Sequence, residues 1–281
     1  MARATKVAVV TGGNKGIGLE VVRGLCRKFD GDVILTARDE AKGHAAVERL
    51  VRESEVEPLF RQLDISNHGS IHRLSNFLLD TYGGLDILVN NAGVMYPMGR
   101  GEVEALSTQV RDTMRVNFWG CLDCCKVLFP HLRPGARVVN VTSMYCRSTL
   151  RECSPPLRAQ LTDPHITMAQ LEKLMTDFQR CADAGTNLVN GWPTFAYGVS
   201  KIGVTAMTQI QQQEMDQSGH KDDILINACC PGWCRTDIGG HGASKSAAQG
   251  ADTPVYLSLL PPGTRSPRGA LLSDRTIQKW G

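Results

Sequence analysis

Short apolar runs alternate with longer stretches of helical periodicity through the first half of the chain. The apolar runs lie at residues 7–10, 33–36, 60–63 and 85–89, and the helical stretches lie at 17–29, 40–51 and 71–79. In the first helical stretch, Ile17, Val21 and Leu25 recur at every fourth position, which places them on one helix face. This alternation predicts parallel strands connected by helices that pack on the sheet.

The second half continues the pattern with one interruption. A further helix is predicted at 116–129, and strands are predicted at 137–141, 224–229 and 270–272, the last at the sheet edge. Between residues 144 and 196 the alternation stops, and Thr167 and Gln170 form a capping box that begins an additional helix. We therefore predict an α/β fold in a single domain, residues 1–281. It is a Rossmann-type, doubly wound parallel sheet with a helical insertion at about 144–196, before the helix that carries Tyr197.

Composition narrows the class of protein. The chain has 281 residues, of which 42% are hydrophobic, enough for a sizeable core in one domain. Its 31 Lys and Arg residues against 28 Asp and Glu give a formal charge of +3, and the basic residues are too dispersed for a nucleic-acid surface. The first apolar run ends after Val10, too short for a signal peptide or membrane span. We expect a cytoplasmic protein that binds neither nucleic acid nor membrane and keeps its ten cysteines reduced.

A glycine-rich loop follows the first predicted strand and leads into the first helix. Its sequence, TGGNKGIG at 11–18, has the spacing G-x-x-x-G-x-G, a variant of the dinucleotide-binding fingerprint. Glycines permit a tight turn and a close approach of a cofactor, and the helix N-terminus favours a pyrophosphate. A glycine loop by itself also fits a plain structural turn; its position between a strand and a helix favours cofactor binding. The residues that we expect to contact the cofactor here are Gly12, Asn14, Lys15, Gly16, Ile17 and Gly18.

Two cations indicate which dinucleotide is bound. Arg38 follows the second strand, where NAD-binding proteins usually carry an acid, and its guanidinium can donate two hydrogen bonds to a phosphate. Lys15 supplies a second cation from the glycine loop. Both favour NADPH. The alternative is that Arg38 is a solvated surface residue, with Asp39 either the ribose acid or the cap of the next helix.

Several motifs in a fixed order carry a family resemblance. They are TGGNKGIG at 11–18, Asp64 after the third strand, NNAG at 90–93, Asn117, Ser143 at the end of VVNVTS, and YGVSK at 197–201. Each is short enough to occur by chance, but the ordered set resembles the short-chain dehydrogenase/reductase family over nearly the whole chain. The resemblance implies an oxidoreductase that transfers a hydride between a nicotinamide and a carbonyl carbon.

The residue types in these motifs fit acid-base chemistry. Tyr197 and Lys201 lie four positions apart, so on a helix both side chains share one face. A phenol titrates near pH 10 and needs a nearby positive charge, from Lys201 and the nicotinamide, to exchange its proton at neutral pH. Tyr197 then protonates the carbonyl oxygen, and Ser143 donates a hydrogen bond to that oxygen. Taken singly, Ser143 also fits a cap, Asn117 a helix bend and Tyr197 a core residue.

The resemblance also implies further roles along the cleft. Lys201 bonds the nicotinamide ribose, and Asn117 holds a water that connects Lys201 to solvent. Trp233 projects towards the substrate as an apolar wall. The remaining cofactor contacts that it implies are Asp64 at the adenine, Asn90 and Ala92 along the cleft, Pro231 and Gly232 beside the nicotinamide, Tyr197 itself, and Thr236 at the carboxamide.

The sequence leaves open which residues contact the substrate and what role Cys230 has. Ser143, Met144, Cys230 and Trp233 are candidate substrate contacts, and Tyr145 and Trp192 are further candidates for the pocket wall. Met144, Tyr145, Trp192 and Trp233 equally fit a role in supporting the insertion. Cys230 is either a reactive thiol beside the site or an inert buried one. We predict no metal site. Cys121, Cys124 and Cys125 fall within a helix pattern that is typical of core packing. Cys229, Cys230 and Cys234 combine a consecutive pair with Pro-Gly and lack the paired C-x-x-C spacing of a structural zinc site.

The long interval between Ser143 and Tyr197 refines the resemblance. Together with GWP at 191–193, the run 197–204 and NACCPGW at 227–233, it is similar to the cytosolic NADPH-dependent carbonyl reductases. Those relatives reduce quinones, aldehydes and ketones, and some act on prostaglandins, steroids or glutathione adducts. In that group the insertion covers the helix face through which other members form tetramers, which implies a monomer. Two alternatives stay open: a narrow hydroxysteroid or prostaglandin dehydrogenase, and a non-catalytic protein that senses NADPH.

Overall fold

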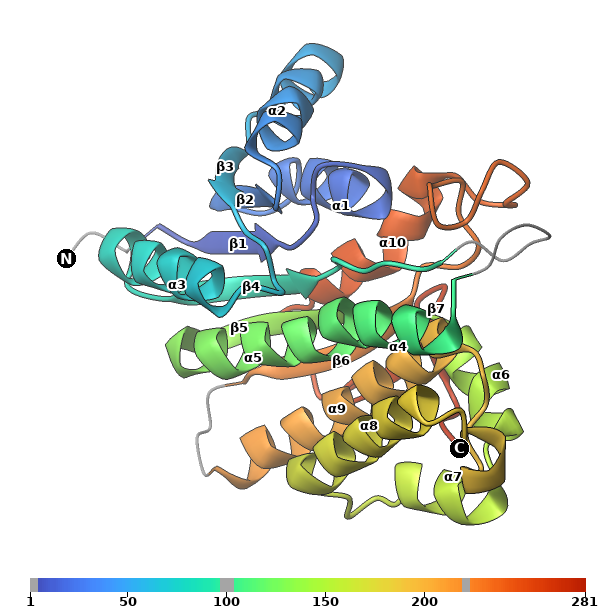
Figure 1. The fold of residues 1–281 in the computed structure, drawn as a ribbon. Coiled ribbons are helices and arrows are strands. Elements are labelled where there is room, and N and C mark those ends of the chain that lie inside the picture. The colour runs from blue at the N-terminus through green and yellow to red at the C-terminus, as the bar shows by residue number, and fades with distance from the viewer. Residues whose placement is uncertain (1–4, 97–103, 219–222) are drawn as a thin grey trace.

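A mostly parallel sheet forms the centre of the molecule. The computed structural model describes residues 5–96, 104–218 and 223–281, and in these residues the sheet has eight strands in the order β3-β2-β1-β4-β5-β6-β7-β8. The strands are β1 (Val7–Val10), β2 (Asp32–Ala37), β3 (Leu59–Gln62), β4 (Leu85–Asn90), β5 (Leu132–Val141), β6 (Leu225–Cys230), β7 (Leu271–Ser273) and β8 (Thr276–Gln278). The strand order reverses between β1 and β4, which opens a crevice at the carboxyl ends of these strands. The predicted α/β, doubly wound fold is confirmed (Figure 1).

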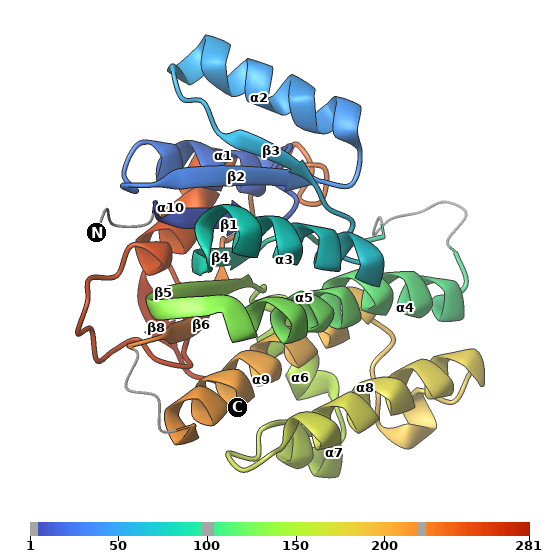
Figure 2. The ribbon, with the colours of Figure 1, turned by 90° about the vertical axis from the view of Figure 1, so that its left-hand side faces the viewer.

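Helices cover both faces of the sheet because the strand side chains alternate between them. In β1, Ala8 and Val10 pack with α1 (Gly16–Cys26), α2 (Glu40–Ser54) and α10 (Ala247–Ser258). Val7 and Val9 point to the other face and pack with α3 (His68–Tyr82) and α5 (Cys121–Leu128). Figure 2 shows the two helix layers on either side of the strands. All four residues of β1 are fully buried, as expected of a central parallel strand.

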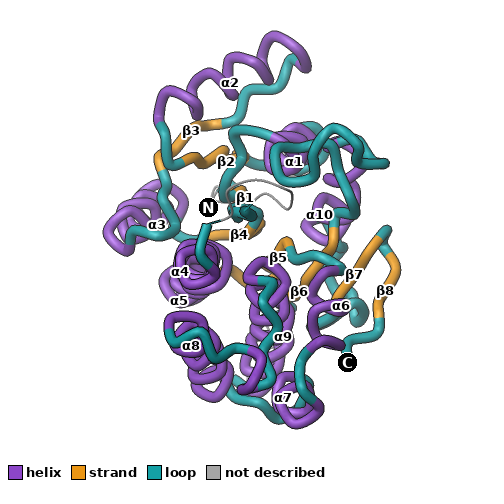
Figure 3. The backbone as a smooth tube through the Cα atoms, turned by 45° about the vertical axis from the view of Figure 1, so that its right-hand side comes forward, coloured by secondary structure: helices purple, strands orange, loops and turns teal. Residues whose placement is uncertain are grey.

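The interval between β5 and the next long helix, α9 (Ala196–Gln217), folds into helices of its own. These are α6 (Tyr145–Glu152), α7 (Pro155–Leu161) and α8 (Met168–Asp183), followed by a 3-10 turn at Leu188–Asn190. The capping box is confirmed: the Thr167 hydroxyl accepts a hydrogen bond from the Gln170 N–H, and the Gln170 side-chain oxygen accepts one from the Thr167 N–H. Helix α8 packs against α9 and α4 (Leu106–Met114) (Figure 3). That residues 144–196 are an insertion into the family fold, within one domain, stays a prediction.

Two local predictions need correction. The single helix expected at 116–129 is instead a π-helical segment (Arg115–Gly120), α5 and a 3-10 turn (Phe129–His131). The predicted edge strand, β7, lies one position inside the sheet, because β8 pairs with it in antiparallel fashion. Asp274 and Arg275 make the connecting two-residue turn with positive φ values of 50° and 58°, as a tight hairpin turn requires. The sequence did not predict β8, because its polar residues Thr276 and Gln278 leave no run of apolar residues there.

No helix in the described part of the chain is both long enough and apolar enough to cross a lipid bilayer.

Candidate active site

The glycine loop between β1 and α1 forms a narrow cradle at the strand-order reversal. Gly12 and Gly16 have positive φ values of 64° and 56°, and a Cβ at Gly18 would lie 2.3 Å from the Gly12 carbonyl oxygen. Glycine is therefore required at these positions. Lys15, the N-cap residue of α1, makes no side-chain hydrogen bond to that helix. The first turn of α1 consequently offers N–H groups at the crevice for an anion.

The NNAG motif supports this cradle through a residue that the sequence did not single out. Asn91 Nδ2 donates to the carbonyl oxygens of Thr11 at 2.9 Å and Gly12 at 3.1 Å. The N–H groups of Asn91 and Ala92 both donate to Thr11 Oγ1. Asn90 behaves differently: its buried side chain donates to Asn140 Oδ1 at 2.8 Å. A cofactor contact at Asn90 stays a prediction.

The charged residues predicted to read the adenosine end are mostly exposed. Arg38 is exposed directly after β2. Asp39 accepts a hydrogen bond from the Lys42 N–H at 3.0 Å and so caps α2, as one of the two alternatives for Asp39 predicted. The ammonium of Lys15 lies 2.5 Å from the Asp237 carboxylate, and this hydrogen bond lowers the pKa of Asp237.

Asp64 lies after β3, and one of its carboxylate oxygens is already bonded. Its Oδ1 accepts from the N–H and the hydroxyl of Ser66, at 2.9 and 2.7 Å. The second carboxylate oxygen makes no hydrogen bond within the described part of the chain, so the predicted adenine contact would fall to it.

Helix α9 and the end of β5 bring the predicted catalytic residues together. Lys201 is 4% exposed, and its Nζ donates to the Val141 carbonyl oxygen of β5 at 2.8 Å. The same Nζ lies 5.5 Å from the centre of the Tyr197 ring. The Ser143 hydroxyl, two residues after the end of β5, lies close enough to the Tyr197 phenol to lower its pKa.

Burial sets the protonation of this pair. Desolvation raises the pKa of Tyr197 well above its ordinary value, and the nearby Cys230 adds to the rise against the Ser143 hydrogen bond. Desolvation also lowers the pKa of Lys201 from its ordinary value of 10.5. In the protein alone Tyr197 is therefore a protonated phenol at neutral pH.

The π-helical segment positions Asn117. Its Oδ1 accepts from the Val94 N–H at 2.8 Å, while its Nδ2 donates to the Val94 carbonyl oxygen and to Ser200 Oγ at 2.9 and 3.0 Å. A Cβ built on Gly93 would lie 3.3 Å from Asn117 Oδ1 and 3.6 Å from Lys201 Nζ. The absent side chain at Gly93 therefore leaves a polar gap between these two groups. Widened helical turns of this type are common at functional sites.

The loop after β6 closes the crevice from the other side. Gly232, with φ of 84°, donates its N–H to Cys230 Sγ at 3.3 Å, and Cys230 is almost fully buried. A Cβ on Gly16 would lie 3.2 Å from Thr236 Cγ2, so Thr236 approaches the glycine loop. Trp233 is 60% exposed and anchored by its indole N–H, which donates to the Gly239 carbonyl oxygen at 2.8 Å.

The candidate wall residues separate into two groups. Met144 and Tyr145 follow Ser143 and are partly exposed, and the Tyr145 ring packs edge-on against the Tyr197 ring with centres 6.2 Å apart. Trp192 is only 3% exposed and packs on Phe178 of α8 at 5.1 Å. Trp192 therefore supports the helical segment, and its role as a pocket wall is wrong.

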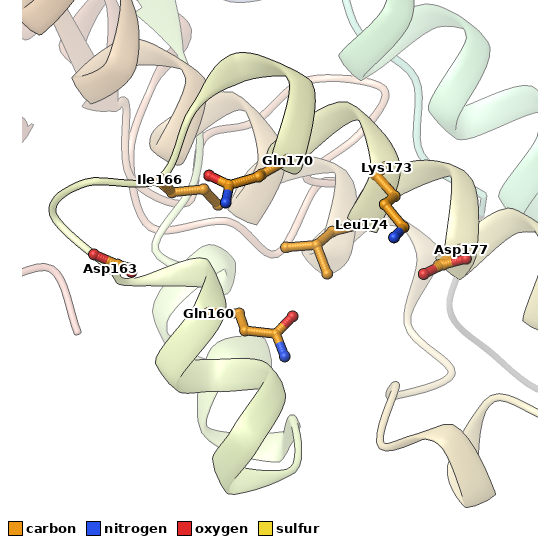
Figure 4. Close-up of a pocket in the computed structure, with 7 residues that line it drawn as sticks. All are labelled: Gln160, Asp163, Ile166, Gln170, Lys173, Leu174 and Asp177. Carbon is orange, nitrogen blue, oxygen red and sulfur yellow. The ribbon is translucent and has the colours of Figure 1, made fainter.

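A separate cavity of about 330 Å³ lies between α7 and α8 (Figure 4). Its lining is Gln160, Asp163, Ile166, Gln170, Lys173, Leu174 and Asp177. None of these is a predicted site residue, so this cavity is distinct from the catalytic crevice.

The buried thiols do not assemble with other ligand types. Within residues 5–96, 104–218 and 223–281, no three His, Cys, Asp or Glu side chains are grouped so that they could hold a metal ion. Cys121, Cys124 and Cys125 lie buried on α5, and burial raises the pKa of the last two.

Comparison with known proteins agrees with this geometry. The sequence profile described as short chain dehydrogenase matches residues 6–155. Carbonyl reductase [NADPH] 1 of Rattus norvegicus is 48% identical over 280 residues and that of Homo sapiens 46%, each comparison covering 100% of both chains. Among solved structures, salutaridine reductase from Papaver somniferum matches with a TM-score of 0.83 and 27% identity, covering 96% of this chain and 99% of its own. Menthone neomenthol reductase from Mentha piperita matches with 0.80 and 28%, covering 96% and 98%. The chain belongs to the short-chain dehydrogenase family.

Proposed function

We propose that the chain is an NADPH-dependent carbonyl reductase that converts quinones, aldehydes and ketones to alcohols. One observation carries the proposal: Tyr197, Lys201 and Ser143 meet at the carboxyl edge of the sheet, where the glycine loop also opens. The relatives that match over their full length are named for carbonyl reduction with NADPH.

The residues of the crevice fit NADPH. The glycine loop is a cradle that a Cβ at Gly18 would fill, and Arg38 is exposed where the adenosine phosphate would arrive. When bound, NADPH supplies the hydride that reduces the carbonyl carbon. We propose that the glycine loop holds the pyrophosphate and Arg38 the 2′-phosphate. Asp64, Asn90, Ala92, Lys201, Pro231, Gly232 and Thr236 would line the rest of the cleft.

The chain's own residues would handle the proton. Tyr197, kept protonated by burial, would donate its proton to the carbonyl oxygen as negative charge develops there. Ser143 would donate a second hydrogen bond to that oxygen. The reductive direction uses the protonated phenol, whereas the oxidative direction would require the phenolate.

Lys201 and Asn117 would resupply the proton. The polar gap at Gly93 lies between Asn117 Oδ1 and Lys201 Nζ, and we propose that a water in this gap connects the ammonium with solvent. Lys201 retains donors beyond the one that bonds Val141, so it can also bond the nicotinamide ribose.

We further propose that the protein is a cytoplasmic monomer. The family resemblance implies that the insertion covers the helix face through which other members form tetramers. Helix α8 of that segment packs on α4 and α9, and this packing supports the proposal. Sedimentation at micromolar concentration should give a mass near 30.6 kDa. A stable tetramer would contradict the role given to α8.

A substrate panel tests the proposed function. NADPH oxidation should be followed with a quinone, a steroid ketone, a prostaglandin and a carbonyl-bearing glutathione adduct, and each should be repeated with NADH. We expect turnover with the quinone and at least one other carbonyl, and preference for NADPH. Turnover confined to the steroid or the prostaglandin would identify a narrow dehydrogenase. Tight NADPH binding without turnover of any substrate would identify a sensor.

A further inference from the structure

Two aromatic rings outside the proton relay surround the Tyr197 phenol. The Tyr145 ring lies nearly perpendicular to both neighbours, 6.2 Å from the Tyr197 ring at 84° and 5.2 Å from the Phe195 ring at 83°. Phe195 lies 6.0 Å from Tyr197 at 48°. The three rings therefore form a triangle in which each contacts the other two.

Backbone contacts tie both aromatic residues to the reacting groups. Tyr145 begins α6, and its N–H donates to Ser143 Oγ at 3.2 Å. Phe195 is the N-cap residue of α9, and its carbonyl oxygen accepts from the Val199 N–H in the first turn of the same helix that carries Tyr197. The main chains of both residues are therefore held beside Ser143 and Tyr197.

Exposure distinguishes this cluster from ordinary core packing. Tyr145 is 43% exposed and Phe195 is partly exposed, whereas the aromatic pair of Phe178 and Trp192 in α8 and its neighbouring turn is buried. An aromatic ring that served packing alone would have little reason to keep so much of its surface open beside the acid that meets the substrate.

Given the proposed function, we propose that Tyr145 and Phe195 form an aromatic wall that determines specificity. The wall selects carbonyl compounds that carry a flat aromatic ring within two bonds of the carbonyl carbon over saturated compounds of equal size. A substrate whose oxygen reaches Tyr197 comes near the Tyr145 ring, which adjoins the Tyr197 ring. A flat π system there can stack or pack edge-on, and such aromatic pairs gain stability beyond the area that they bury. A puckered saturated ring gains only the burial term.

A matched pair of ketones isolates this effect. Benzyl methyl ketone and cyclohexylmethyl methyl ketone have the same carbon skeleton and an unconjugated carbonyl, so their intrinsic reactivities are close. The measured quantity is the ratio of their kcat/KM values with NADPH, for the wild-type chain and for Tyr145→Leu, Phe195→Leu and Tyr145→Phe. Leucine preserves apolar volume without the ring, and phenylalanine preserves the ring without the hydroxyl.

We expect the aromatic-to-saturated ratio to fall about threefold to tenfold in Tyr145→Leu, mainly through KM for the aromatic ketone. Phe195→Leu should lower it less, and Tyr145→Phe should keep it. Binding of NADPH, measured by fluorescence, should remain within about twofold in every variant and shows that each is folded.

The outcomes separate the two proposals. If the ratio of kcat/KM values is unchanged in both leucine variants, Tyr145 and Phe195 do not determine specificity, while the proposed function stands. A ratio lost in Tyr145→Phe also overturns the aromatic wall, because the hydroxyl and not the ring would then select. A wild-type chain that binds NADPH but reduces neither ketone contradicts the proposed function, and the wall with it.

Discussion

The two ends of the crevice are built in opposite ways. At the reaction end, Lys201 and Asn117 are almost fully buried, and both bond backbone groups of neighbouring elements. At the adenosine end, Lys15 and Arg38 are exposed, and the partner of Lys15 is another exposed side chain, Asp237. Buried polar groups are costly to leave without partners, whereas exposed ones exchange partners with water. We therefore expect substitutions at the buried, candidate catalytic end to disturb the fold as well as activity, and substitutions at the exposed end to change cofactor preference with little structural consequence.

The largest expected effect is at the reaction end. Tyr197→Phe removes only the hydroxyl, so the ring contacts with Tyr145 and Phe195 remain. We expect kcat for reduction to fall by about 10²- to 10⁴-fold, the usual contribution of a general acid, with NADPH affinity within about twofold. Stopped-flow turnover and fluorescence titration measure the two quantities. Turnover within tenfold of the wild type would show that another group donates the proton.

Asn117→Leu tests the buried end of the crevice through its effect on the free energy of unfolding. The variant leaves the Val94 N–H and carbonyl oxygen, as well as the Ser200 hydroxyl, without the partner that Asn117 supplies. An unsatisfied buried group costs about 1–3 kcal/mol, but Val94 is only partly buried and Ser200 keeps its hydrogen bond to the Tyr197 carbonyl oxygen, so we expect the free energy of unfolding to fall by about 2–4 kcal/mol in all. Urea denaturation measures it, with Arg38→Asp as the exposed-end control at less than about 1 kcal/mol. Equal losses in the two variants would remove the contrast between the ends.

Burial also decides which elements of the fold could be predicted from the sequence. The strands β1, β2 and β4 were predictable because fully buried parallel strands are nearly continuous apolar runs. The π-helical turn at Asn117 was not, since one widened turn leaves the apolar periodicity almost unchanged.

The directions of single side chains in the site also could not be predicted from the sequence. Asn90 and Asn91 are chemically identical neighbours, and only the end of β4 decides that Asn90 bonds Asn140 while Asn91 bonds the glycine loop. Asn90 is the last residue of β4 and Asn91 the first residue after it, and the sequence pattern did not resolve where the strand ends. Likewise, Trp192 lies close to Tyr197 in sequence but packs into the α8 core. Family motifs therefore predicted residues that the structure brings together at one site, whereas the packing of Trp192 could be read only from the fold.

Arg38→Asp tests the exposed end directly. If Arg38 binds the 2′-phosphate, the variant loses charge-assisted hydrogen bonds and introduces repulsion. We expect the ratio of kcat/KM with NADPH to that with NADH to fall by about 10- to 100-fold, with the NADH value nearly constant. Steady-state assays with one carbonyl substrate and both cofactors give the ratio. An unchanged cofactor preference would assign Arg38 to the solvated surface instead.

The smallest effect concerns Lys15 and Asp237, which lie 2.5 Å apart and are 67% and 75% exposed. An ion pair this exposed is strongly screened by solvent, so Asp237→Asn should change the free energy of unfolding by less than about 1 kcal/mol. The lowered pKa of Asp237 means that its contribution is present at neutral pH and is lost as pH falls below its ordinary range. If Lys15 also binds the cofactor phosphate, removing the competing carboxylate should tighten NADPH binding by about twofold to fivefold and leave NADH binding unchanged. Weaker binding of both cofactors in Asp237→Asn would instead mean that the pair holds the loop after β6 against the glycine loop, so that Lys15 acts at the exposed end through structure and not through the phosphate.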